Sequence, residues 1–180
     1  MFFKGLVYYA RYIWRKWGEE EKRRSLYVGK KTEHKDFMAI ALKQAKKAEN
    51  LSEVPIGAVL VDNKGKIISK GYNFCLHLFD PTAHAEIIAI REAGEELFNY
   101  RLGDTTLYVT IEPCIMCMAA AVNARIKRIV YGAADYKAGA AGSVYSLHED
   151  PNLNHRIEII GGVMQEECRE LMLGFFRKRR

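Results

Sequence analysis

Two short motifs, about thirty residues apart, constrain the fold of this chain more than any other feature. The first contains His84 and Glu86, and the second contains Cys114 and Cys117 directly after a proline. One imidazole and two thiolates are a complete set of protein ligands for a catalytic zinc ion, whose fourth tetrahedral position is left to water. The chain is therefore expected to fold so that His84, Cys114 and Cys117 meet at one point.

Glu86 supplies the proton chemistry that such a site needs. A carboxylate beside the ligands can take the proton that the bound water must lose and can later give it to a leaving group. The alternatives are a structural zinc site and a pair of reduced core cysteines. Structural sites usually have four ligands, from two Cys-x-x-Cys pairs or from one pair and two histidines. Here the second half is His-x-Glu, which favours a catalytic site.

Both motifs are predicted to lie at the N-termini of helices. An apolar β-type run, 105–111, precedes Cys114, and residues of helical composition follow Cys117. Pro81 is a start signal for a helix over 82–94. The positive ends of two helix dipoles would then face one point, where they favour thiolates and hydroxide.

Length and composition are typical of one globular domain. The chain has 180 residues, of which 49% are hydrophobic and 28% are charged, so it can bury a sizeable core. The two cysteines outside the motifs, Cys75 and Cys168, are expected to be reduced thiols of a cytoplasmic protein. The longest stretch without a charged residue, 113–124, has 12 residues. No transmembrane helix and no membrane partner are therefore expected.

The net charge of +6 is concentrated at the two ends of the chain. Residues 1–34 hold 9 Lys/Arg and 4 Asp/Glu, and residues 177–180 are all basic. We predict that 1–34 is an N-terminal extension, which could form a basic, aromatic helix on a membrane or on RNA, or could do little. The catalytic domain is predicted to span 35–180, with a basic tail that could meet phosphates.

The hydrophobic pattern predicts alternating helices and strands. The expected elements are a helix from Lys35 that ends before Pro55, a hairpin of strands 56–61 and 66–72, an irregular loop to Pro81, the helix 82–94, the strand 105–111, the helix 116–123, the strand 128–132, a Gly/Ala-rich loop 133–146, the strand 157–160 and the helix 166–180. This alternation implies an α/β sheet with helices packed on both faces.

Further motifs connect the chain to a known family. His-x-Glu followed by Pro-Cys-x-x-Cys is the signature of zinc-dependent deaminases. Five more stretches occur in the same order along the chain as in members of this family. They are 54–61 (VPIGAVLV), 123–126 (NARI), 137–143 (KAGAAGS), 154–158 (NHRIE) and 175–180 (FFRKRR). On these motifs, residues 35–180 resemble the bacterial tRNA-specific adenosine deaminases of the cytidine deaminase-like superfamily, and the last three stretches point to the tRNA branch.

The resemblance implies a fold, an activity and an assembly. The fold would be a three-layer α/β/α sandwich around a five-stranded mixed sheet. The activity would be hydrolytic deamination of the wobble adenosine in a tRNA anticodon loop, which yields inosine and ammonia. The protein would be a cytoplasmic homodimer with one Zn²⁺ per subunit. His84, Cys114 and Cys117 would hold the zinc, and Glu86 would carry protons.

The resemblance also assigns five residues to the substrate. It implies that Asn73 and the backbone amide of Ala85 bind the base, that Asp135 approaches the sugar of the target nucleotide, and that Phe175 and Arg177 meet the anticodon loop. An asparagine at such a position could equally cap a turn. The basic tail could equally be solvated.

Aromatic residues of the domain could stack on nucleobases. Tyr136, Tyr145 and Phe175 are candidates, and each such contact is worth about 1–3 kcal/mol. Core packing is the alternative for each of them, and Phe176 is expected to be buried.

Two other functions fit parts of the pattern. A deaminase of free bases or nucleosides, such as guanine or cytosine, would use the same ligands and the same glutamate but would have no need for a basic terminal helix. An RNA-binding module with a structural zinc, acting as a noncatalytic subunit of a heterodimer, would have no use for Glu86. Both therefore explain less of the sequence than the tRNA deaminase.

Overall fold

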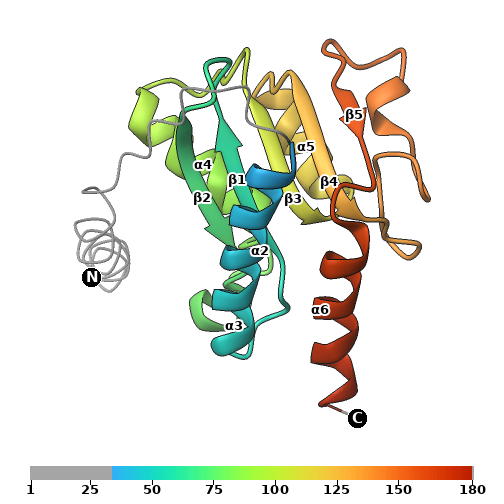
Figure 1. Cartoon of the computed structure of the whole chain (residues 1–180). Coiled ribbons are helices and arrows are strands. Elements are labelled where there is room, and N and C mark those ends of the chain that lie inside the picture. Colours follow the sequence, from blue (N-terminus) through green and yellow to red (C-terminus); the bar gives the residue numbers. More distant parts are fainter. Residues whose placement is uncertain (1–33, 180) are drawn as a thin grey trace.

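A five-stranded mixed sheet forms the centre of the computed structural model, which describes residues 34–179 (Figure 1). The predicted N-terminal extension lies outside the described residues, apart from His34. In spatial order the strands are β2 (Ile67–Tyr72), β1 (Gly57–Val61), β3 (Thr106–Ile111), β4 (Arg128–Ala133) and β5 (Glu158–Ile160). β1 runs antiparallel to β2 and β3, whereas β3, β4 and β5 are parallel. The predicted five-stranded mixed sheet is confirmed.

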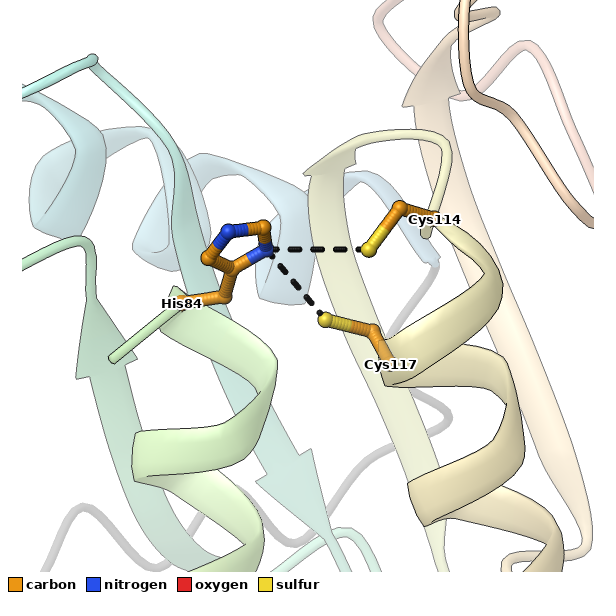
Figure 2. Close-up of side chains that lie close together, drawn as sticks. All are labelled: His84, Cys114 and Cys117. Carbon is orange, nitrogen blue, oxygen red and sulfur yellow. Dashed lines mark hydrogen bonds between the residues drawn. The ribbon is translucent and has the colours of Figure 1, made fainter. Parts of the chain in front are cut away.

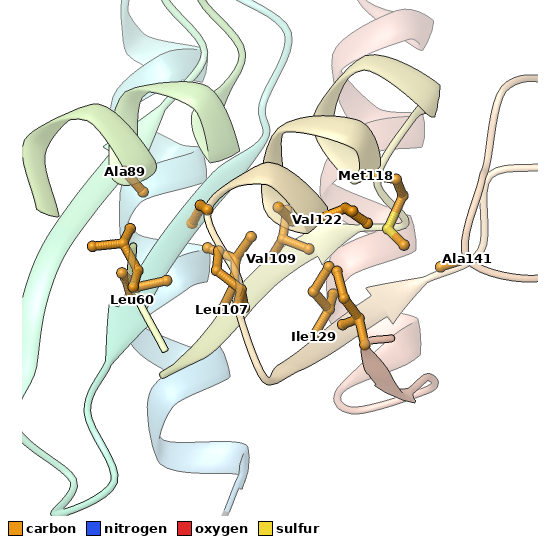
Figure 3. Packing of buried hydrophobic residues seen from close by; sticks show 14 of the residues in the cluster. Leu60, Ala89, Leu107, Val109, Met118, Val122, Ile129 and Ala141 are labelled. Carbon is orange, nitrogen blue, oxygen red and sulfur yellow. The ribbon is translucent and has the colours of Figure 1, made fainter. Parts of the chain in front are cut away.

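Helices cover both faces of this sheet. The helices are α2 (His34–Asn50), α3 (Cys75–Leu78), α4 (Ala85–Leu97), α5 (Ile115–Asn123) and α6 (Gln165–Arg177), and a short 3-10 helix spans Leu147–Glu149. One core cluster joins α4 and α5 to the sheet (Figure 3). A second cluster joins α2 and α6 to the sheet. The predicted three-layer α/β/α sandwich is therefore confirmed.

Alternation along the strands explains the two clusters. Leu60 and Leu107 face α4 and α5, whereas their neighbours Val59 and Tyr108 face α2 and α6. Successive side chains of a strand point to opposite faces of a sheet. A strand with a helix layer on each side is therefore apolar at nearly every position, as the fully buried β1 is.

Two elements between β2 and α4 differ from the prediction. The segment expected to be an irregular loop contains α3, and the helix expected at residue 82 begins at Ala85. The second difference has a local cause, because one carboxylate oxygen of Asp80 accepts hydrogen bonds from both the backbone N–H and the hydroxyl of Thr82. This turn holds Thr82 outside the helix. The other predicted boundaries agree to within a few residues.

Candidate metal centre

The two motifs meet at one end of the sheet, where two helices begin. His84 is the N-cap of α4, and Cys114 is the N-cap of α5, just beyond the end of β3. Both residues have extended backbone, with φ values of −70° and −73°, and neither side chain makes a capping hydrogen bond. Their side chains are therefore free to bind a ligand. Because His84 precedes the helix and Glu86 lies in its first turn, both can face the same point.

The three predicted ligands lie close together. The Nδ1 atom of His84 is 3.7 Å from the Cys114 sulfur and 3.5 Å from the Cys117 sulfur (Figure 2). All three donor atoms lie within 4.8 Å of one another. Tetrahedral zinc, with its usual bond lengths, places a nitrogen and a sulfur ligand about 3.6 Å apart. The donor set and its spacing therefore fit zinc.

The two thiols also have the electrostatics of metal ligands. A hydrogen bond from Cys117, together with the hydrogen bond and the charge of His84, lowers the pKa of Cys114 to about 4. The same hydrogen bond raises the pKa of Cys117. The hydrogen bond to Cys114 also raises the pKa of His84. Thiolate is the form of cysteine that binds metals, so the Cys114 sulfur is held in the binding form at neutral pH.

Glu86 is a buried carboxyl group beside these ligands. Its side chain is 3% exposed, and burial raises its pKa to about 6. Among residues 34–179 its Oε2 atom has no hydrogen-bond partner. A carboxyl group that titrates near neutral pH can both accept and donate a proton. A buried oxygen without a hydrogen-bond partner costs free energy. Such an oxygen is expected at a site that is prepared for a bound group.

Asn73 and Ala85 contact each other in the structure. The Oδ1 atom of Asn73 accepts the backbone N–H of Ala85 at 2.8 Å, and Asn73 is buried. This bond satisfies one of the free N–H groups in the first turn of α4 and ties that helix to the end of β2. Asn73 therefore supports the turn that carries Glu86. The contact of Asn73 and Ala85 with a base stays a prediction.

Asp135 lies in the loop after β4, which packs against the metal motif. Its Oδ1 atom accepts the backbone N–H groups of Lys137 and Ala138. Gly139, in the same loop, forms a β-bridge with Cys114. The structure thus brings the loop of Asp135 to the metal centre, and the contact of Asp135 with a sugar stays a prediction.

The aromatic residues of α6 are placed differently from the expectation. Phe176 was predicted to be buried, and this prediction is wrong because Phe176 is 48% exposed whereas Phe175 is 3% exposed. Cys168 and Leu171 of α6 belong to the core cluster on the sheet, Phe175 lies one helical turn after Leu171, and the Arg179 guanidinium covers the Phe175 ring at 3.6 Å. Arg177 is paired with Glu170. Contact of Phe175 and Arg177 with RNA stays a prediction.

Two of the family motifs contact each other at the opposite end of the sheet. The Arg125 guanidinium donates to the backbone oxygen and to the side-chain oxygen of Asn154, and the Nε2 atom of His155 lies 2.7 Å from the backbone oxygen of Ile126. Arg125 and Ile126 precede β4, and Asn154 and His155 precede β5, whereas Cys114 follows the parallel strand β3. The two motifs therefore stabilise the connection after α5.

Replacing Asn154 by alanine is expected to lower the free energy of unfolding by about 1 kcal/mol, the usual contribution of a hydrogen bond. Because Asn154 lies far from the metal centre, the variant should keep the KM of the native protein. Urea denaturation beside steady-state kinetics would test this. A large rise in KM without loss of stability would show that Asn154 acts on the substrate.

Comparisons with known proteins agree with this geometry. Residues 31–133 match the family model of the cytidine and deoxycytidylate deaminase zinc-binding region. The tRNA-specific adenosine deaminase of Haemophilus influenzae is 52% identical over 144 residues, which cover 80% of this chain and 83% of that protein. The enzyme of the same name from Bacillus subtilis is 44% identical over 149 residues, which cover 83% of this chain and 92% of that protein.

Solved structures share the fold. A structure from studies of tRNA:A34 deaminases, which edit adenosine to inosine at the wobble position, aligns with a TM-score of 0.73 and 45% identity over 76% of this chain and 98% of its own. A guanine deaminase from Nitrosomonas europaea aligns with a TM-score of 0.70 over 85% of this chain and 88% of its own. At 19% identity, the second match supports the fold alone.

Proposed function

This chain belongs to the tRNA-specific adenosine deaminases, within the zinc-binding cytidine and deoxycytidylate deaminase family, and we propose that it converts the wobble adenosine of a tRNA to inosine. The observation that carries the proposal is the meeting of His84, Cys114 and Cys117 beside the buried carboxyl of Glu86, in a chain 52% identical to such an enzyme. Zinc is the cofactor of the family, and one ion per subunit would be held by these three ligands.

The chemistry is a hydrolysis in which Glu86 moves the protons. Bound zinc supplies a nucleophile at neutral pH, because it lowers the pKa of water from about 15.7 toward 7. Glu86 takes a proton from the attacking water as a bond forms to C6 of adenine. It gives this proton to the ring nitrogen, then takes the second proton from the new hydroxyl on C6 and gives it to the departing amine, so that ammonia leaves and inosine remains.

The target base must leave its stack to reach this site. An anticodon loop presents unpaired bases, which lowers the cost of that movement. Asn73, directly after β2, and the amide of Ala85, at the start of α4, lie next to each other and contact the base. Asp135 approaches the ribose. Phe175 and Arg177, near the end of α6, contact the anticodon loop.

The assembly and the location are parts of the same proposal. Residues 35–180 form the deaminase domain, which acts as a homodimer in the cytoplasm. Leu76 and Phe79, on α3 and just after it, are exposed apolar side chains of the kind that a subunit interface covers. Light scattering should give twice the mass of the 20.6 kDa chain. Between residues 34 and 179, no helix has the length and apolarity needed to cross a membrane.

Replacing Asn73 by alanine is expected to lower kcat/KM about 10- to 100-fold and to leave zinc bound. The substitution removes the acceptor of the Ala85 N–H and the proposed base contact, which together are worth about 1–3 kcal/mol. Asn99 provides the matched control, because its side chain accepts the N–H of Arg101 beyond the far end of α4. Asn99→Ala should keep native kinetics. Equal losses in the two variants would contradict a substrate role for Asn73.

The substrate class can be tested with a panel of four compounds. Purified zinc-loaded protein would be offered an anticodon stem-loop with adenosine at the wobble position, free adenosine, guanine and cytidine. Turnover of the stem-loop alone supports the proposal. Turnover of a small molecule alone would move the chain to a nucleobase deaminase, and no turnover of any compound would indicate a noncatalytic subunit.

A further inference from the structure

Glu112 is a buried carboxylate that the proposed reaction does not use. It lies between β3 and Cys114 and is 3% exposed. Its Oε1 atom accepts the backbone N–H groups of Ala141 and Ser143 at 2.9 and 3.0 Å. Its Oε2 atom accepts the backbone N–H of Asp135 at 3.1 Å. One carboxylate thus binds both ends of the loop 135–143.

These contacts make Glu112 the main polar anchor of that loop. A buried carboxylate is costly unless hydrogen bonds satisfy it, and N–H groups that donate to a charged acceptor form strong bonds. The donors are backbone groups, which no ordinary substitution removes. The position of the loop therefore depends on the side chain at position 112.

Close packing at Gly139 brings the loop against the metal motif. A Cβ atom on Gly139 would lie 2.5 Å from Cδ and Oε2 of Glu112 and 2.5 Å from the backbone oxygen of Asp135, so only glycine fits here without displacing the carboxylate and the loop backbone. The backbone N–H of Ala140 donates to the oxygen of Pro113 at 2.8 Å, and Gly139 is bridged to Cys114. The loop is thus fixed directly to the segment that carries the first cysteine ligand.

The loop and its continuation carry side chains suited to RNA. Asp135 is the residue proposed to approach the ribose. Tyr136 is 84% exposed and Tyr145 is 47% exposed, and exposed aromatic rings are stacking surfaces for unpaired bases. We infer that Glu112 is a positioning residue, which sets where this loop meets the nucleotides that flank the target adenosine. This inference rests on the proposed function.

Glu112→Gln tests the inference with little change of volume. Glutamine replaces one acceptor oxygen with an NH₂ group, so at least one loop N–H faces a donor and loses its partner. The KM for the stem-loop should rise about tenfold, the effect of losing roughly one good contact. The kcat value and the zinc content should stay near those of the native protein, because Glu86 and the three ligands are untouched.

Two further variants sharpen the test. Gly139→Ala disturbs the same contact from the loop side, so it should also raise KM, and the double variant should be no worse than the stronger single one. Asp62→Asn is the control, because Asp62 accepts two backbone N–H groups at 2.8 Å in the β1–β2 turn, at the other end of the sheet. Asp62→Asn should not change KM.

Hydrogen exchange provides a readout that does not depend on activity. In Glu112→Gln the amides of Asp135, Ala141 and Ser143 should exchange faster, while those of β3 are unchanged. A native KM despite faster loop exchange would overturn the inference alone. Equal losses of kcat and zinc would also overturn it, since Glu112 would then only support the metal centre. If the native protein itself does not turn over the stem-loop, the proposed function fails, and the inference fails with it.

Discussion

Replacing Glu86 by glutamine is expected to lower turnover about 10³-fold, within the usual range for loss of a general acid–base group, while zinc stays bound. Glu86 contributes no ligand atom to the group formed by His84, Cys114 and Cys117. Glutamine has nearly the same shape but cannot exchange a proton at neutral pH. Attack by water and departure of ammonia would therefore both lack their proton carrier.

The measurement is single-turnover inosine formation on the stem-loop, beside the zinc content of each preparation. Glu96→Gln is the matched control, because Glu96 is an exposed residue of the same helix, α4. The control should keep the native rate. A Glu86→Gln protein that forms inosine at a near-native rate would exclude Glu86 as the proton carrier.

Replacing Cys117 by alanine is expected to remove both the zinc and the activity. Cys117 is fully buried on the first turn of α5, and it is one of only three side chains in the predicted ligand set. Loss of one ligand leaves two, which is too few to hold a catalytic zinc ion. Turnover should fall below detection, and the zinc content should fall from one ion per subunit to a small fraction.

Thermal unfolding gives an independent readout of the same change. A metal that binds only the folded state raises the unfolding temperature, so a chelator should lower the midpoint of the native protein but not that of Cys117→Ala. Cys168→Ala is the matched control, since Cys168 is a buried thiol of α6 in the core cluster on the other face of the sheet, away from the ligands. The control should keep its zinc. Full zinc content in Cys117→Ala would contradict the ligand assignment.

The sequence predicted the parts of the molecule that depend on local pattern. The strands could be predicted because their successive residues pack into two different apolar layers, as Val59 and Leu60 do. The metal ligands were visible because zinc accepts few residue types, and the spacing of Cys114 and Cys117 suits one helical turn. The resemblance to a family added the activity, which spacing alone does not specify.

The parts that were missed depend on contacts between distant residues. α3 has only four residues and no apolar stripe, and the Glu53 carboxylate accepts the N–H groups of Leu76 and His77 from more than twenty positions away. Such a contact leaves no local pattern. A signal for Glu112 was present, because a carboxylate directly after a buried strand needs N–H partners. The choice between Phe175 and Phe176 depended on how α6 is rotated against the sheet.

Wobble-specific deamination is tested most directly with an anticodon stem-loop that carries adenosine both at the wobble position and at a second loop position. The measurement is the position at which inosine forms. Zinc-loaded native protein should form inosine at the wobble position alone, and Glu86→Gln should form none in the same time. Inosine at both positions, or at neither, would contradict a wobble-specific deaminase built on His84, Cys114, Cys117 and Glu86.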